Sequence, residues 1–332
     1  MKNKKLRAMV VEPTEDQVCT RFIQEKTVDD LPEGDVLIRV KYSSLNYKDA
    51  LSATCNPGVT RNFPHTPGID AAGIVEESAH ARYKKGDAVI VTSYDLGMNT
   101  SGGFGQYVRV PAEWVVRLPE GLSLKESMIF GTAGFTAGMS VHEVAGNVAT
   151  HAGDILVTGA SGGVGSISVA ILARLGYSVV AVSGKPDSAA FLKGLGAKET
   201  IPRNAVVDDS GKPLLKSRWA GAIDTVGGDI LAGVIKAMDA GGIVTCCGNV
   251  AGPELSLTIF PFILRGVRLV GINSQSCPMA HRLKVWEHLA NDWKIDLGNE
   301  LYREIALEQL DEHIDRILAG GQKGRVLVNL ER

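Results

Sequence analysis

The stretch ILVTGASGGVGSISVAILARLG, residues 155–176, decides the fold of this 332-residue chain. A strand-like apolar run leads into a turn with four glycines, and an apolar helix follows at once. Small residues at Ala160 and Gly162 let backbone N–H groups approach a pyrophosphate, and Gly165 lets the helix pack closely on the strand. A simple strand-to-helix turn would have a similar sequence. The context favours dinucleotide binding, and the candidate binding residues of the turn are Ser161, Gly162, Gly163 and Val164.

Downstream of the turn, strand-like and helix-like segments alternate. The runs SVVAV at 178–182 and GAIDTVG at 221–227 read as strands with a helical segment between them. Two more strand candidates follow, then amphipathic helices, then a last strand in RVLVNL at 325–330. This alternation predicts a parallel α/β unit.

Upstream, the first 125 residues read as short strands cut by turns, which is typical of antiparallel β structure. We therefore expect a β-rich domain over 1–127 and a dinucleotide-binding domain over 128–268. The segment 269–332 contains two helices and a strand, and we expect it to return to the first domain.

Composition excludes several classes of protein. Hydrophobic residues make up 45% and charged residues 22%, as in ordinary globular proteins. The 38 glycines are an excess that suggests tight turns or backbone lying close to a ligand. A net charge of −2 gives no indication of nucleic-acid binding.

The chain has no uninterrupted apolar stretch of 18 residues, and its first residues lack the pattern of a secretion signal. We expect a cytoplasmic protein that does not bind membranes. The five cysteines are odd in number and lack C-x-x-C spacing, so we expect reduced, buried thiols rather than disulfides or a zinc site.

The end of the second strand indicates which dinucleotide binds. An NAD site usually has a carboxylate there, whereas this chain has Ser183, Gly184 and Lys185, with Arg203 after the next strand. A hydroxyl, space and two cations suit the 2′-phosphate of NADPH. Solvated side chains are the alternative for the two cations, and Asp187 weakens the prediction unless it starts the next helix.

Several segments together carry a family resemblance: SSLNYKDAL at 43–51, PGIDAAGIV at 67–75, FGTAGFTAGMSV at 130–141, VTGASGGVGS at 157–166 and KGRVLV at 323–328. The chain resembles the medium-chain dehydrogenases/reductases, in the zinc-free quinone oxidoreductase branch and its acrylyl-CoA reductase subgroup. The resemblance covers nearly the whole sequence.

The resemblance implies an α/β fold with a GroES-like catalytic domain and a Rossmann domain with a doubly wound parallel sheet. It implies an enzyme that reduces the C=C bond of a short 2-enoyl-CoA with NADPH, and a homodimer. Quinone reduction is an alternative that needs the same hydride delivery. A non-catalytic NADPH-binding sensor is a second alternative, because a fold does not determine a function.

The zinc-dependent members of the superfamily have an early Cys and a G-H-E motif. Here Asn46 stands in the first region and Gly68-Ile69-Asp70 in the second, so we expect no metal site. His65 is the nearest candidate ligand, and we assign it a structural or loop role.

Without zinc, hydride addition to an enoyl thioester needs donors for the thioester oxygen and a proton source for the α carbon. By resemblance, Asn46 and Tyr47 face the nicotinamide and the substrate, with Tyr47 as a donor. Asp49 would hold that loop or tune Tyr47. A turn role for Asn46 and a core role for Tyr47 are the alternatives.

The resemblance also indicates cofactor contacts elsewhere, each with a packing or surface role as the alternative. Those contacts would come from Thr132, Thr136, Gly248, Asn249, Asn273 and Arg325, with the arginine reaching a phosphate. Asn273 replaces the Asp expected at its position, which leaves the fine geometry there open.

Overall fold

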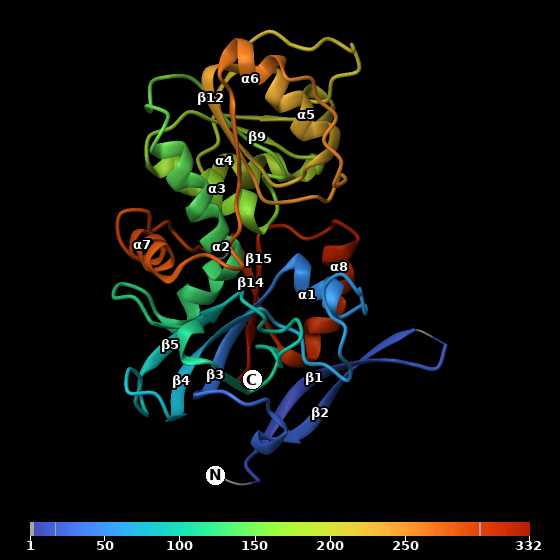
Figure 1. Ribbon diagram of the computed structural model, residues 1–332, viewed down its shortest axis with the longest axis vertical. Coiled ribbons are helices and arrows are strands. Elements are labelled where there is room, and N and C mark those ends of the chain that lie inside the picture. Colours follow the sequence, from blue (N-terminus) through green and yellow to red (C-terminus); the bar gives the residue numbers. More distant parts are fainter. Residues whose placement is uncertain (1–2, 17, 299) are drawn as a thin grey trace. The chain divides into compact units, whose positions relative to one another are not determined.

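The computed structural model describes residues 3–16, 18–298 and 300–332 (Figure 1). The chain divides into two compact units. Unit 1 comprises Met1–Thr132, Gln275–Ala290 and Leu297–Arg332, and unit 2 comprises Ala133–Ser274 and Asn291–Asp296.

Unit 2 is built on a six-stranded sheet in the order β10-β9-β8-β11-β12-β13. Every pair in it is parallel. The order reverses direction between β8 and β11, which is the Rossmann arrangement that the glycine turn predicts. Its strands are β8 (Ile155–Val157), β9 (Val179–Val182), β10 (Glu199–Ile201), β11 (Trp219–Asp224), β12 (Met238–Cys246) and β13 (Arg268–Gly271).

The apolar sequence of these strands and helices explains their burial. All four residues of β9 are buried, as expected of a parallel strand covered on both faces. Helix α3 is buried continuously from Gly165 to Leu172. The helices of this part of the chain are α2 (Leu124–Ala145), which begins in unit 1, α3 (Gly163–Arg174), α4 (Ala189–Gly194), α5 (Gly228–Lys236) and α6 (Phe260–Arg265), with 3₁₀ turns η3 (Pro186–Ser188) and η4 (Arg203–Ala205).

Unit 1 contains a seven-stranded sheet in the order β14-β15-β3-β4-β5-β7, with β6 also paired to β3, and a separate β1-β2 hairpin. The pairs are antiparallel except β14 with β15. The strands are β1 (Lys5–Pro13), β2 (Cys19–Thr27), β3 (Val36–Leu45), β4 (Asp70–Ser78), β5 (Ala88–Thr92), β6 (Tyr107–Val110), β7 (Val115–Arg117), β14 (Tyr302–Ala306) and β15 (Arg325–Asn329).

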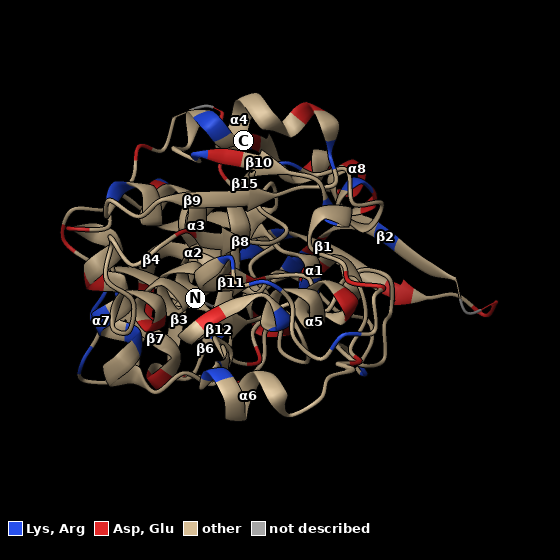
Figure 2. Ribbon diagram, turned by 90° about the horizontal axis from the view of Figure 1, so that it is seen from above, with Lys and Arg blue, Asp and Glu red and all other residues tan. Residues whose placement is uncertain are grey.

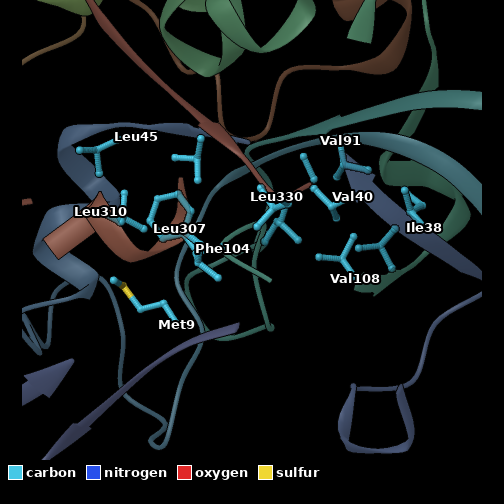
Figure 3. Packing of buried hydrophobic residues seen from close by; sticks show 14 of the residues in the cluster. Met9, Ile38, Val40, Leu45, Val91, Phe104, Val108, Leu307, Leu310 and Leu330 are labelled. Carbon is cyan, nitrogen blue, oxygen red and sulfur yellow. The ribbon is translucent and has the colours of Figure 1, made fainter. Parts of the chain in front are cut away.

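The core of unit 1 joins residues from both ends of the chain. Figure 3 shows Ile38 and Val40 of β3 near Val108, with Leu307 and Leu330 from the C-terminal segment in the same cluster. Helix α1 contacts α8. The helices of this unit are α1 (Tyr47–Ser52), α7 (Met279–Ala290) and α8 (Leu310–Leu318), with 3₁₀ turns η1 (Val28–Asp30), η2 (Ala112–Trp114) and η5 (Leu307–Gln309).

The expectation of five reduced thiols is wrong for two of them. Cys19, the first residue of β2, is joined in a disulfide to Cys55, just beyond α1, and their Cα atoms lie 5.9 Å apart. The other three cysteines are free, but only Cys277 is buried. A spacing argument misses the pair because the fold brings together residues 36 positions apart.

Figure 2 shows Lys and Arg interspersed with Asp and Glu along the chain. Within the described residues, no helix combines the length and apolar character that a membrane crossing requires.

Candidate active site

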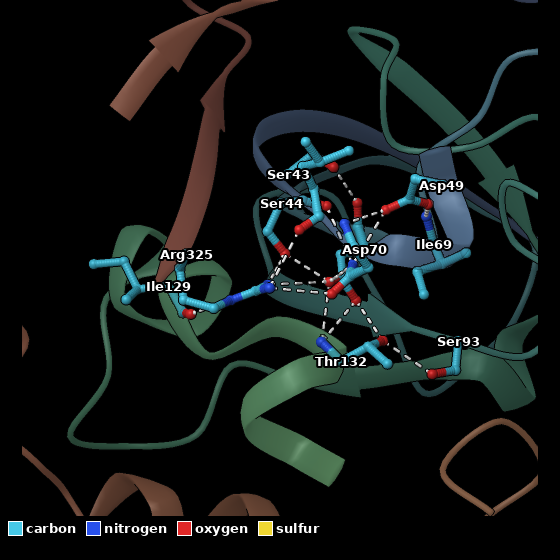
Figure 4. A network of polar contacts seen from close by, with 11 residues as sticks. Ser43, Ser44, Asp49, Ile69, Asp70, Ser93, Ile129, Thr132 and Arg325 are labelled. Carbon is cyan, nitrogen blue, oxygen red and sulfur yellow. Dashed lines mark hydrogen bonds and ion pairs between the residues drawn. The ribbon is translucent and has the colours of Figure 1, made fainter. Parts of the chain in front are cut away.

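Asp70, the first residue of β4, is the centre of a polar network in unit 1 (Figure 4). Its carboxylate is fully buried and accepts hydrogen bonds from Ser44 Oγ at 2.6 Å and from Asn46 Nδ2 at 2.7 Å. Thr132 donates from its backbone N–H at 3.0 Å and from its hydroxyl at 2.7 Å. These donors compensate the burial of the charge.

Arg325 supplies the positive charge of the same network. Its Nη2 lies 3.9 Å from Asp70 Oδ2 and donates to Ser44 Oγ at 2.8 Å. Its other guanidinium donors reach Ile129 O, Leu45 O and Asn46 Oδ1. The side chain is 3% exposed, so the guanidinium is buried within unit 1.

Asn46 and Asp49 fix the start of α1. The Asp49 carboxylate accepts from the Asn46 backbone N–H at 2.7 Å, which is half of a capping box, and from the Ile69 N–H at 2.7 Å. The Asn46 side chain points to Asp70 and Asp49. With Asn46 8% exposed and Asp49 fully buried, both side chains position the helix.

Burial and the neighbouring Asp70 charge raise the pKa of Asp49 to about 7, against the opposing effect of its backbone donors. Arg325 lies in the same low-dielectric environment, and burial lowers the pKa of its guanidinium. The buried network thus contains two carboxyl groups, Asp49 and Asp70, and one guanidinium, Arg325, so it has one more acidic group than basic groups.

Gly131 makes the network possible. It has φ of 52° and ψ of −157° and breaks the helical geometry of α2. A Cβ there would lie 2.5 Å from Asp70 Oδ2 and closer still to Ser44 Oγ. The kink allows the next residue, Thr132, to bind Asp70, and Thr132 Oγ1 also lies 2.9 Å from Ser93 Oγ.

Tyr47 and Lys48 are the residues of the N-terminal turn of α1 whose side chains reach the surface. Tyr47 is 37% exposed, and Lys48 is half-buried with its Nζ 2.8 Å from Gln275 Oε1. Tyr47 and Lys48 therefore carry a phenol and an ammonium on a helix whose first turn is held by Asn46 and Asp49.

Among residues 3–16, 18–298 and 300–332, no group of three or more His, Cys, Asp or Glu side chains is arranged to hold a metal ion. Asn46 and Ile69, at the positions where the resemblance implies the zinc ligands of related enzymes, offer neither thiolate nor imidazole. His65 is buried, and its backbone pairs with Val11 on β1.

In unit 2, the glycine turn leads into α3 with Gly162 as the N-cap, and no described side chain caps that helix end. The first backbone N–H groups, at Gly163 and Val164, fit an anion such as a pyrophosphate. A Cβ at Gly165 would lie 2.7 Å from Ala160 Cα, so close packing requires glycine there. The buried Ser161 completes the turn.

Ser183 donates to Ser161 Oγ at 3.1 Å and accepts from the Lys185 N–H at 3.1 Å. The Arg203 side chain packs against Gly184: a Cβ added at Gly184 would lie 2.5 Å from the Arg203 Nε. Two hydroxyls and the Arg203 guanidinium thus lie at or next to the Ser183–Gly184 segment, with the Lys185 backbone bonded to Ser183, and such donors fit a phosphate monoester.

The other residues predicted to contact the cofactor lie after β12, after β13 and in α2. Gly248 and Asn249 follow β12, and a Cβ at Gly248 would overlap the Thr225 carbonyl oxygen. Asn273 is exposed after β13, and Thr136 is buried in α2.

The placement of Arg325 argues against the phosphate contact predicted for it, because its donors already bind partners in unit 1. Asp49 is fully buried and accepts from the Asn46 and Ile69 N–H groups, and its role in holding the loop or tuning Tyr47 stays a prediction. Sequence reasoning missed Asp70 and Ser44. The available signal was an acidic residue within the apolar run at 67–75, since a buried carboxylate needs partners.

Two family models match the chain. Residues 32–120 match the alcohol dehydrogenase GroES-like domain, and residues 163–291 match the zinc-binding dehydrogenase model. These matches agree with a β-rich unit and a parallel-sheet unit.

Three relatives match along nearly their whole length. The putative quinone oxidoreductase YhfP of Bacillus subtilis is 45% identical over 98% of both chains. The crystal structure of Bacillus subtilis yhfP with NAD bound has a TM-score of 0.95 and 43% sequence identity, and the match covers 98% of this chain and 99% of that one. The acrylyl-CoA reductase AcuI of Ruegeria pomeroyi is 42% identical over 97% of this chain and 98% of its own. The yhdH oxidoreductase of Salmonella enterica in complex with NADP has a TM-score of 0.94 with 41% identity, covering 97% and 99%.

Proposed function

Because the chain belongs to the medium-chain dehydrogenase/reductase family, in its zinc-free quinone oxidoreductase branch, we propose that it reduces the C=C bond of a short 2-enoyl-CoA ester with NADPH. Acrylyl-CoA is the expected type of substrate, and propionyl-CoA the product. The observation that carries the proposal is the buried Asp70–Arg325 network, which holds Asn46 at the start of α1, the helix that bears the Tyr47 phenol and the Lys48 ammonium.

This arrangement suits an acceptor that is already activated. An enoyl thioester conjugates its double bond with a carbonyl, so hydride addition at the β carbon places negative charge on the thioester oxygen. Bound NADPH supplies that hydride. Tyr47, half-exposed at the first position of α1, donates a hydrogen bond to the charged oxygen, and Asn46 and Asp49 keep α1 in place.

The proposed coenzyme contacts lie in unit 2. The N-terminus of α3 and the turn at Ser161–Val164 bind the pyrophosphate. Ser183, Lys185 and Arg203 bind the 2′-phosphate that distinguishes NADPH from NADH. Thr136, Gly248, Asn249 and Asn273 remain candidate contacts to the rest of the coenzyme. A cytoplasmic location is part of the proposal, because free coenzyme and acyl-CoA esters must both reach the enzyme.

Quinone reduction is the second candidate, and the 45% identity with a protein named putative quinone oxidoreductase favours it. The same hydride delivery serves a quinone. A coenzyme-binding sensor is the third candidate, and it would bind NADPH without consuming it.

We also propose a homodimer. In the six-stranded sheet β13 is an edge strand, and the nearby α6 region exposes Ile259, Ile263 and Leu264 by 62–67%. An open strand edge beside exposed apolar side chains favours pairing with a second copy. Light scattering should give twice the 35.3 kDa chain mass, and Ile263→Glu should shift the mass toward one chain.

The experiment that separates the candidates is NADPH oxidation at 340 nm with acrylyl-CoA, crotonyl-CoA and a small benzoquinone, repeated with NADH. Turnover of acrylyl-CoA with NADPH supports the enoyl-CoA reductase. Fast quinone turnover with poor CoA-ester turnover favours the second candidate. Tight NADPH binding with no turnover of any acceptor favours the sensor.

A further inference from the structure

Lys48 has a neutral hydrogen-bond partner rather than a carboxylate. Its ammonium bonds the neutral side-chain oxygen of Gln275 at 2.8 Å, from a residue 227 positions away. Both residues are half-buried. The contact joins α1 to the start of the second chain segment of unit 1.

Gln275 is itself fixed through its backbone. Its carbonyl oxygen accepts from the Tyr94 N–H at 3.2 Å and lies 3.5 Å from Arg282 Nη2. The Arg282 guanidinium is fully buried, donates to Thr92 O at 3.0 Å, and lies 4.4 Å from the centre of the Tyr94 ring. The oxygen that holds Lys48 therefore belongs to a rigid part of unit 1.

The neutral partner has a chemical consequence. An amide oxygen accepts a hydrogen bond from an ammonium and from a neutral amine alike, so Lys48 keeps its position after it loses a proton. A carboxylate partner would instead hold the proton on the lysine.

Tyr47 and Asp49 flank Lys48 on its own helix, and Tyr94 and Arg282 contact the Gln275 carbonyl oxygen. Burial lowers the pKa of Lys48, and the Asp49 charge opposes that effect. A lowered pKa makes an ammonium a stronger acid at neutral pH.

We propose that Lys48 is the acid that protonates the α carbon of the substrate, and that Gln275 is the residue that positions its ammonium. The proposal rests on the enoyl-CoA reduction proposed above and names the proton source that this reaction needs. It places the acid one residue from Tyr47, the donor to the thioester oxygen, on a helix turn fixed by Asp49.

For a 2-enoyl-CoA, the C4–H bond of the NADPH nicotinamide breaks, leaving NADP⁺, and its hydride forms the C–H bond at the β carbon, while the electron pair of the double bond moves into the enolate. The enolate α carbon then forms a C–H bond with a proton from Lys48 Nζ, whose N–H bond breaks. Lys48 is left as a neutral amine, and a proton from water restores the ammonium.

The test compares wild type with Lys48→Met, Lys48→Arg and the surface control Lys193→Met on crotonyl-CoA and NADPH in D₂O. The configuration of the new C–D bond in 2-deuteriobutyryl-CoA is determined by NMR of a chiral derivative. We expect a single configuration from wild type and from Lys193→Met. Arginine keeps the charge but does not donate its proton, so Lys48→Arg and Lys48→Met should both lower kcat about 10²- to 10⁴-fold and give mixed configurations.

Gln275→Glu tests the positioning role, because a carboxylate beside Lys48 should raise the pH at which kcat falls on the alkaline side and lower its maximum. NADPH binding and the urea unfolding midpoint report whether each variant folds. If folded Lys48→Arg or Lys48→Met keeps the wild-type kcat and configuration, Lys48 is not the acid. If wild type itself does not reduce crotonyl-CoA or acrylyl-CoA, the proposed function fails, and the assignment of Lys48 fails with it.

Discussion

The guanidinium of Arg325 lies 3.9 Å from the carboxylate of Asp70, and these two residues, 255 positions apart in the chain, are 3% and 0% exposed. The pair joins β15 to β4 through a shared partner, Ser44 on β3. It ties the C-terminal strand to the residues that hold α1.

Removing one partner of this pair should destabilise unit 1 strongly. Arg325→Met leaves the Asp70 charge buried without its cation, and we expect a loss of about 3–5 kcal/mol in the free energy of unfolding. Urea unfolding measures the loss. As a control, Arg316→Met removes an exposed arginine and should cost less than about 1 kcal/mol. Equal, small losses in both variants would mean that the pair contributes little.

Asp49 should make stability depend on pH. Its pKa in the folded protein is about 7, raised above 3.8, so the folded state binds its proton more tightly than the unfolded state does. The stabilisation is fully present below about pH 4 and is lost as the pH rises through 7. The free energy of unfolding should therefore fall between pH 4 and pH 7.

Asp49→Asn removes the titrating carboxyl group, but it also replaces one of the two oxygens that accept from the Asn46 and Ile69 N–H groups. The free energy of unfolding of this variant at a single pH therefore does not report the titration alone. The slope of stability against pH is the informative quantity. Asp224, a buried carboxyl of unit 2 whose pKa burial also raises, keeps its own contribution in both proteins. An unchanged slope in Asp49→Asn would show that Asp49 titrates normally.

Gly131→Ala should disrupt the polar network directly. The added Cβ meets Asp70 and Ser44, and the backbone has a φ of 52°. Gly266→Ala is a matched control, because its φ is 61° and a Cβ there has open space. Thermal unfolding should place the loss at Gly131 well above the roughly 1–2 kcal/mol expected from backbone strain at Gly266. Comparable losses would mean that the network tolerates the methyl group.

Lys185→Ala and Arg203→Ala should each weaken NADPH binding about 10- to 100-fold, as expected for the loss of one charge-assisted phosphate contact. NADH lacks the 2′-phosphate, so its binding should stay within about threefold. Fluorescence titration with both coenzymes measures this, and Lys193→Ala serves as the control. Parallel weakening for both coenzymes would contradict the phosphate assignment.

The sequence predicts the parts of the molecule that depend on local patterns. The glycine turn at 155–176 predicts the parallel-sheet unit because its requirements are local, and the family model over 163–291 and the strand order agree with it.

The rest depends on contacts between distant residues. Arg325 appears in the sequence as a cation near the end of the chain, and only its pairing with Asp70 shows that it is buried. Gln275 has no sequence signal, because its role comes from a contact with Lys48 across 227 positions. The Cys19–Cys55 disulfide likewise depends on how the hairpin packs beside α1.

The most direct test of the central claim is to follow the hydride into the product. Acrylyl-CoA is incubated with NADPH deuterated at C4 of the nicotinamide, on each face in turn, and the product is analysed by mass spectrometry and NMR. We expect propionyl-CoA with one deuterium at C3 from one of the two labelled coenzymes. Oxidation of NADPH without deuterium at C3, or no propionyl-CoA while a quinone is reduced, would contradict it.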